Sequence, residues 1–263
     1  MNAFPAPTLT EHLAAVTAAA ERLASAAAVA GLETAVPTCP GWSVRDLVAH
    51  VGMVHRWATA HASGDSSGLD GSATSSSEAR GRGHDDPVAW LREGAANLVA
   101  AIRAAPADLE ALVFLPDAPP PREFWARRQC HETTVHAVDA LSAVLGRTPS
   151  AAEADVPTAV ALDGIDELLT GFIRRRRSRL RSDEPLGIGV RPRDTDAAWL
   201  VEVGSEAPVT TRHTSASLPG ADVTFGGTAA QLYLGLWNRG EEIEADDADV
   251  LELWRRLVTV SWS

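Results

Sequence analysis

The stretch PREFWARRQCHETTVHAVDALSAVL, residues 121–145, decides the fold of the first half of this chain. Pro121 suits the first position of a helix, where its missing N–H costs nothing, and the segment predicts one helix as far as Leu145. Glu132 and His136 stand four residues apart within it. At about 100° per residue their side chains lie roughly 40° from each other, so both can bind one metal ion.

His50 is the candidate for a third ligand. It lies in SVRDLVAHVGMVHRWA, residues 43–58, where Ser43 predicts an N-cap and apolar residues recur at helical spacing. A bundle that packs this helix against residues 121–145 would bring the imidazole of His50 to Glu132 and His136. Three protein ligands beside an open position are typical of catalytic zinc, whereas four ligands close a structural site.

Two more helices complete a predicted bundle. One covers about 8–31 and opens with the capping-box pattern Thr8-x-x-Glu11, and the other begins at Pro87 and runs to about Ala104. Residues 64–86 contain almost no apolar side chain, so we expect them to form a mobile connection. The pattern predicts an up-and-down four-helix bundle over residues 1–148.

The second half of the chain has a different pattern. After the linker RTPSAAEADVP (147–157), a helix is predicted at 158–181, strands at 186–191, 197–204, 207–213 and 222–226, and helices at 228–238 and 247–258. Strands in succession flanked by helices indicate a small α+β domain with a mainly antiparallel sheet over residues 155–263. The predicted fold class is therefore α+β, in two domains.

Composition limits the possible partners and the cellular compartment. Hydrophobic residues make up 45% and charged residues 22%, as in soluble globular proteins, and no apolar run approaches the ~20 residues of a membrane span. The start, MNAFPAPTLTEHL, lacks the pattern of a secretory signal, so we expect a cytoplasmic protein without a membrane partner. The net charge of −12 disfavours a nucleic-acid partner.

The two cysteines, Cys39 and Cys130, have no C-x-x-C spacing and predict neither a disulfide framework nor a cysteine zinc site. A thiol cofactor would therefore have to come from outside the chain. Every basic residue is an arginine. The absence of lysine excludes Schiff-base chemistry by this chain.

The metal-binding interpretation has an ordinary alternative, because acid–base pairs at i,i+4 also stabilise helices. His131 precedes His136 by five residues and faces elsewhere, so the string is not the HExxH of zinc peptidases. Asp139 could orient a ligand or be a solvated helix residue. Any of Asp139, His55 and Cys39 would make the site structural if it became a fourth ligand.

Three segments of the chain resemble one known family. VPTCPGWSVRDLVAHVGMVHRWA (36–58), RRQCHETTVHAVDAL (127–141) and GGTAAQLYLGLWNRGEEIEADDADVLELW (226–254) are similar to segments of the mycothiol-dependent maleylpyruvate isomerase family. The resemblance implies a DinB-like metal-binding four-helix bundle followed by a sterol-carrier-like domain. It also implies that His50, Glu132 and His136 hold a divalent metal, zinc in the isomerase, whose open position receives the sulfur of mycothiol.

The same resemblance implies a reaction. A metal holds a thiol as thiolate at neutral pH, and the thiolate would add to the cis double bond of maleylpyruvate and leave again as the trans product, fumarylpyruvate. Arginines suit the substrate carboxylates, and Arg239 in LWNRG and Arg212 beside His213 are the candidates, although either could be structural. The expected partners are mycothiol and a small unsaturated acid, bound by a monomer or homodimer.

Two other functions stay open from the sequence. The metal could activate water and hydrolyse a small ester or amide without any thiol, or the protein could bind a small ligand without catalysis. Separately, the arginine run at 174–177 with Arg179 and Arg181 is predicted to be the solvated C-terminal end of a helix, where the helix dipole favours positive charge.

Overall fold

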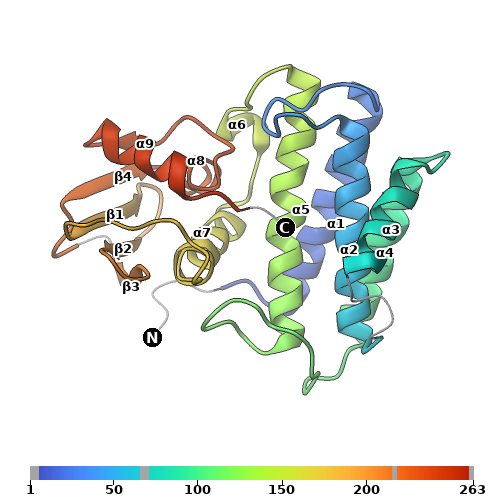
Figure 1. The fold of residues 1–263 in the computed structure, drawn as a ribbon, viewed down its shortest axis with the longest axis horizontal. Coiled ribbons are helices and arrows are strands. Elements are labelled where there is room, and N and C mark those ends of the chain that lie inside the picture. Colours follow the sequence, from blue (N-terminus) through green and yellow to red (C-terminus); the bar gives the residue numbers. More distant parts are fainter. Residues whose placement is uncertain (1–5, 66–70, 215–217, 261–263) are drawn as a thin grey trace. The chain divides into compact units, whose positions relative to one another are not determined.

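The computed structural model describes residues 6–65, 71–214 and 218–260 (Figure 1). The chain divides into two compact units. The helical unit comprises residues 8–114 and 119–149, and the α+β unit comprises residues 115–118 and 150–260 together with the described N-terminal residues that precede Thr8.

The helical unit is built from four long helices and one short one: α1 (Leu9–Ala30), α2 (Val44–Ser63), α3 (Gly71–Arg82), α4 (Pro87–Ala104) and α5 (Pro121–Leu145). Helix α1 packs mainly against α5 and α4, and α2 packs mainly against α4, α3 and α5. Helices α1 and α2 have few contacts with each other, as have α4 and α5. The expected four-helix bundle is present, and the long connections within these two pairs let the chain cross it.

Local sequence signals set the starts of these helices. Thr8 and Ser43 form reciprocal capping boxes with the residues three positions later, and the carboxylate of Asp86 caps α4 through the backbone of Ala89. The apolar stripes meet in a core that contains several residues without solvent exposure, namely Leu23, Leu47, Val48, Val51, Leu91 and Ala140. Helix α2, which carries His50, is therefore capped at its start and buried along one face.

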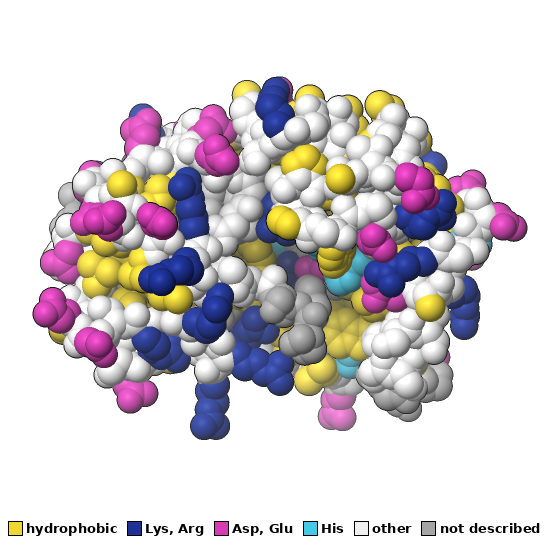
Figure 2. Space-filling model, turned by 45° about the horizontal axis from the view of Figure 1, so that its top comes forward, with side chains coloured by type: hydrophobic (Ala, Val, Ile, Leu, Met, Phe, Trp, Pro, Cys, Tyr) yellow, Lys and Arg dark blue, Asp and Glu magenta, His cyan; other side chains and the backbone are white. Residues whose placement is uncertain are grey.

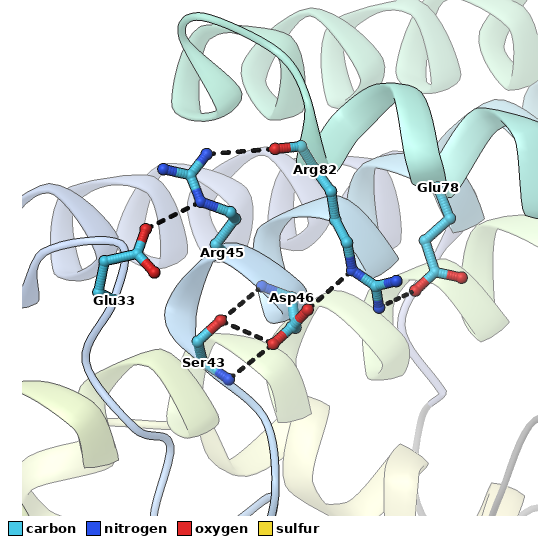
Figure 3. A network of polar contacts seen from close by, with 6 residues as sticks. All are labelled: Glu33, Ser43, Arg45, Asp46, Glu78 and Arg82. Atoms are coloured by element: carbon cyan, nitrogen blue, oxygen red, sulfur yellow. Dashed lines mark hydrogen bonds and ion pairs between the residues drawn. The ribbon is translucent and has the colours of Figure 1, made fainter.

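Helix α3 corrects the expectation for residues 64–86. Residues 66–70 lie outside the described part, but Gly71–Arg82 is helical. Polar contacts help to hold this segment in place: Arg82 bonds to Asp46 through Nε at 2.7 Å and to Glu78 through Nη2 at 2.9 Å (Figure 3). Arg45 of α2 also donates to the carbonyl oxygen of Arg82. These ion pairs substitute for the apolar face that the sequence lacks.

Two glycines let Trp90 of α4 enter between α2 and α3. A Cβ on Gly52 would lie 2.1 Å from the Trp90 ring, and one on Gly81 would lie 2.5 Å from it. No side chain larger than hydrogen fits at either position without displacing the indole. Gly81 is also the one described residue of α3 that is buried.

Helix α1 is the one described helix long and apolar enough to cross a membrane by length and composition. Its side chains Leu13, Val16 and Leu23 are buried, and the helix packs against α5 and α4. The core helix of a globular bundle meets the same criteria, and these contacts are those of a core helix.

The α+β unit contains the short helix α6 (Ala151–Ala154), α7 (Thr158–Glu167) continued by the π-helical turn η2 (Leu168–Phe172), α8 (Ala229–Leu236) and α9 (Ala248–Leu257). Its sheet is formed by β1 (Leu186–Pro192), β2 (Ala197–Val203), β3 (Val209–Thr214), β4 (Val223–Gly227) and β5 (Glu244–Ala245), in the order β3-β2-β1-β4-β5. Only the β1–β4 pair is parallel among the described strands. The predicted α+β class with a mainly antiparallel sheet is confirmed.

The predicted helix at 158–181 is too long. Regular helix ends at Glu167, η2 follows, and the residues after Ile173 form turns. The helix does not continue because residues 174–177 are four consecutive arginines, which provide no apolar side chain to bury. Arg174 instead forms an ion pair with Asp117, and Arg175 lies over the ring of Phe172 at 4.6 Å. Strand β5 was not predicted because two residues carry no periodic pattern.

Both acidic side chains and arginines appear on the molecular face drawn in Figure 2, with hydrophobic side chains exposed near several of the arginines. The excess of acidic residues in the sequence therefore does not exclude local regions of positive charge.

Candidate metal centre

The side chains of His50, Glu132 and His136 meet inside the helical unit. One ligand atom from each lies within 4.8 Å of the other two, and all three residues are buried. Glu132 Oε1 is 3.2 Å from His136 Nε2 and 3.5 Å from His50 Nε2. Helix α5 supplies the i,i+4 pair on one face, and the packing of α2 against α5 supplies His50.

The donor set fits a metal. His50 Nε2 and Glu132 Oε1 are buried and have no hydrogen-bond partner among the described residues. A buried polar atom without a hydrogen bond costs free energy. A cation bound between these two atoms and His136 Nε2 would remove that cost. Two imidazole nitrogens and a carboxylate oxygen are also the ligand types that zinc accepts at catalytic sites.

Asp139 orients the ring of His136. Its Oδ2 lies 2.8 Å from His136 Nδ1, which leaves Nε2 directed at Glu132. Thr38 donates to the other oxygen, Oδ1, at 2.6 Å, and Thr38 Oγ1 is 3.0 Å from Ser142 Oγ. Carboxylate–histidine–metal arrangements of this kind fix the ring and its tautomer. Of the two alternatives for Asp139, the structure shows a buried partner of His136 and not a solvated residue.

The turn before α2 supplies Thr38 and also one wall of the candidate site. Trp42 lies in this turn, with its ring at 5.0 Å from that of His50 in an edge arrangement and stacked parallel to that of His136 at 6.4 Å. Gly41 makes the turn possible, because its φ of 86° is one that side chains rarely adopt. The VPTCPGW segment is thus in contact with the residues of the candidate centre as well as being a connection.

Arg128 is a buried neighbour that the sequence analysis missed. It is 1% exposed and its Nη2 lies 3.3 Å from Glu132 Oε2. The guanidinium therefore holds one carboxylate oxygen while the other oxygen faces the two histidines. The i,i+4 spacing of Arg128 and Glu132 was the available signal, but the sequence cannot tell a buried pair from a solvated one.

The charges at the centre depend on one another. Burial would raise the pKa of Glu132, but His136, His50 and Arg128 more than reverse this and hold its pKa well below the usual value. Burial likewise would lower the pKa of His136, yet Asp139 and Glu132 raise that pKa to about 9 in the metal-free chain. A metal would therefore have to displace a proton from His136.

None of the three candidate fourth ligands joins the trio in the described part of the chain. Asp139 faces the far nitrogen of His136, and His55 Nε2 is 3.0 Å from Thr133 Oγ1. Cys39 groups with His136 and Asp139, but that set excludes His50 and Glu132. A site with three protein ligands keeps an open position, which is the arrangement of catalytic zinc.

The other aromatic and histidine candidates have core roles. His131 is buried with its ring edge-on to His12 at 6.3 Å, apart from the trio. Trp57 and Trp125 pack edge-on at 5.1 Å, and the Trp125 ring stacks on His61 at 4.7 Å. These two tryptophans belong to an aromatic cluster between α2 and α5 that fixes the pairing of the two helices.

The two predicted catalytic arginines lie in the α+β unit. Arg212, on β3, donates to both carboxylate oxygens of Asp166, from Nε at 2.5 Å and from Nη2 at 2.7 Å. Asp166 also accepts from the indole of Trp199 at 3.0 Å. Arg239, just after α8, donates from Nη1 to the carbonyl oxygen of Trp237 at 3.2 Å. A role of either guanidinium in catalysis stays a prediction.

With this geometry in place, the chain can be compared with known proteins. Residues 13–141 match the family model of the mycothiol maleylpyruvate isomerase N-terminal domain. This part of the chain belongs to that family. The matched range contains His50, Glu132 and His136, and the resemblance recognised from the sequence motifs is confirmed. No curated protein matches the chain in sequence.

Solved structures extend the comparison to the rest of the chain. The crystal structure of the mycothiol-dependent maleylpyruvate isomerase matches with a TM-score of 0.61 at 17% sequence identity, over 91% of this chain and 93% of that one. A histidine-to-alanine mutant of the mycothiol-dependent maleylpyruvate isomerase gives 0.59 at the same identity and coverage. At this identity the likeness establishes a shared α+β fold.

Proposed function

We propose that this protein is a metal- and mycothiol-dependent enzyme of the maleylpyruvate isomerase type, acting on a small unsaturated acid. The observation that carries the proposal is the convergence of two unpaired buried ligand atoms, His50 Nε2 and Glu132 Oε1, with His136 Nε2. The family of the N-terminal domain supports the choice of thiol. We further propose that residues 1–148 form the DinB-like metal-binding domain and residues 155–263 the sterol-carrier-like domain of a cytoplasmic monomer or homodimer.

In this proposal His50, Glu132 and His136 hold a divalent metal, zinc by ligand type. Such a metal, when bound, lowers the pKa of a coordinated thiol so that the thiolate prevails at neutral pH. The chain's own residues prepare the ligands. Asp139 keeps His136 Nδ1 engaged, and Arg128 keeps one oxygen of Glu132 engaged. The ring of Trp42 lies beside both histidines and forms one wall of the site.

The reaction itself needs a thiolate and free rotation about one carbon–carbon bond, with no net uptake of a proton. The thiolate sulfur adds to one carbon of the cis double bond, and the electron pair of that bond moves onto the conjugated carbonyl oxygen as an enolate. After rotation about the resulting single bond, the enolate electron pair re-forms the double bond and expels the thiolate, which gives the trans product. A guanidinium suits the substrate carboxylate, and Arg239 and Arg212 are the two candidates for this role.

The test measures metal content first and thiol binding second. Purified protein should contain about one metal per chain, and His50→Ala and Glu132→Ala should lose it. Calorimetry should then detect mycothiol binding to the metal-loaded protein and none to the metal-stripped protein. Arg103→Gln, which changes an exposed arginine near the end of α4, is the matched control and should retain both properties.

Two outcomes would contradict the proposal. Full metal content in both ligand variants would show that these residues do not form the site. Turnover of simple esters or amides by the loaded protein without any thiol would favour a metal hydrolase instead.

A further inference from the structure

The arginine run at 174–181 needs a different explanation from the one suggested by its sequence. A helix dipole favours positive charge within the last turn of a helix. The regular helix α7 ends at Glu167 and η2 at Phe172, so Arg177, Arg179 and Arg181 lie well past that turn. Positive charges placed in succession repel one another, so another interaction must favour them here.

Several of these guanidiniums have partners within the α+β unit. Arg174 pairs with Asp117, and Arg175 lies over the Phe172 ring. Arg179 Nη2 donates to the carbonyl oxygen of Arg256 at 2.9 Å and to Thr259 Oγ1 at 3.2 Å. These bonds attach the Arg179 head group to the segment that follows α9 and hold it in place.

A cavity of about 440 Å³ lies beside this segment. Its apolar lining comes from two segments. One is η2 with the residue after it, which supplies Leu168, Phe172 and Ile173. The other is the last residue of α9 with the chain after it, which supplies Leu257, Val258 and Val260. Arg175, Arg177 and Arg179 line it as well, together with Ser178 and Thr259. The volume is within the range of small-molecule sites, about 300–1,000 Å³.

The charge of this lining is one-sided. Three arginines contribute to the cavity and no described aspartate or glutamate does. Arg177 is exposed and has no ion-pair or hydrogen-bond partner among the described residues. Arg179 donates from Nη2 alone in both of these bonds. An apolar floor beside the exposed guanidiniums of Arg177 and Arg179 fits an anion that carries an apolar tail.

We propose that this cavity binds a carboxylate with an unbranched apolar tail. The carboxylate lies at Arg177 and Arg179, and the tail lies against Phe172, Leu257 and Val258. Arg179 is fixed in advance by the chain after α9, so little side-chain entropy is lost when the ligand binds. Every residue that lines the cavity belongs to the α+β unit, and none of them is a proposed metal ligand.

Calorimetry on the full-length, metal-loaded protein tests this with octanoate as the probe, below its micellar concentration. We expect saturable binding with one octanoate per chain, and no comparable binding of octanol or octylammonium. Affinity should rise by up to about fourfold for each methylene added from butanoate to octanoate, as expected if the tail is buried. Equal binding of octanol and octanoate, or no saturable binding, would overturn the proposal.

Variants locate the site. Arg177→Gln should weaken octanoate binding about tenfold, since a charge-assisted hydrogen bond is lost. Its melting temperature should not change, because Arg177 is exposed and unpaired.

Arg103→Gln removes the same charge elsewhere and should bind octanoate normally. His50→Ala should also bind it normally, which separates this site from the metal centre. Unchanged octanoate affinity in Arg177→Gln, or loss of binding in His50→Ala, would contradict the assignment.

Discussion

Asp139 is the carboxylate that orients the imidazole of His136, one of the three proposed metal ligands. It occupies Nδ1 of His136 and is itself held by the Thr38 hydroxyl. The ring of His136 therefore has one nitrogen available, and that nitrogen faces Glu132. Without this contact the ring of His136 could rotate or change tautomer. Its Nε2 would then no longer point toward the other two proposed ligands.

We expect Asp139→Asn to weaken metal affinity about 10- to 100-fold while the protein stays folded. The amide keeps the shape of the side chain but loses the charge that favours the ring orientation. Competition with a chromogenic chelator measures the affinity, and circular dichroism checks the fold. Asp85→Asn, at an exposed aspartate before α4, is the control and should bind metal as the wild type does. An affinity unchanged in Asp139→Asn would exclude a role in positioning His136.

His55 predicts a pH dependence of stability. Burial is the main cause that lowers its pKa from 6.5 to about 3. Between these values the unfolded chain binds a proton that the folded chain does not, so folding loses stability as the pH falls. The contribution is complete above pH 6.5 and declines toward pH 3, by up to about 1.4 kcal/mol per pH unit.

Replacing His55 by glutamine should flatten this dependence. The amide can keep a hydrogen bond to Thr133 but does not titrate. Urea unfolding of metal-free wild type and His55→Gln at several pH values between 4 and 7 gives the difference. His84→Gln, which alters an exposed histidine, should follow the wild-type curve. Parallel curves for wild type and His55→Gln would refute the burial argument.

At the scale of elements, the start of α2 is held by contacts from two directions. Asp46 completes the capping box with Ser43 and also accepts from Arg82 of α3 (Figure 3). Arg45 reaches Glu33 on one side and the Arg82 carbonyl oxygen on the other. The same few residues therefore cap the helix that carries His50 and attach a polar helix that has almost no buried face of its own.

Asp46→Ala should lower the free energy of unfolding by about 1–2 kcal/mol, because a helix cap and an ion pair are lost together. Glu78→Ala removes only the second ion pair of Arg82, which caps no helix, and should cost less than about 1 kcal/mol. Chemical denaturation measures both values. Equal losses in the two variants would mean that the cap contributes nothing beyond the surface ion pairs.

At the scale of the whole molecule, metal binding and folding should be linked. The proposed ligands come from α2 and α5, which are far apart in the sequence, so the site exists only in the folded helical unit. Free zinc at about 100 times its dissociation constant should therefore stabilise the protein by about 2.7 kcal/mol. Thermal unfolding with increasing zinc measures this shift. His50→Ala should show little or none of it, and a full shift in that variant would place the metal elsewhere.

Local patterns in the sequence determined most of the elements. Pro121, Ser43 and Thr8 mark helix starts that the structure reproduces within a residue or two, because caps and proline act on neighbouring backbone groups. The placement of Glu132 and His136 on one face follows from the helical period alone. The four longer strands were found from their apolar residues and turn signals.

What the sequence could not supply depends on contacts between distant segments. That His50 meets Glu132 follows from the packing of α2 on α5, and the bond from Thr38 to Asp139 spans 101 positions. The bond from Arg212 to Asp166 likewise joins separate elements, and α3 is held by ion pairs that no periodic pattern announces. Periodicity and caps encode local conformation and its buried face, whereas the partner of each buried polar group is decided only when the helices and strands pack together.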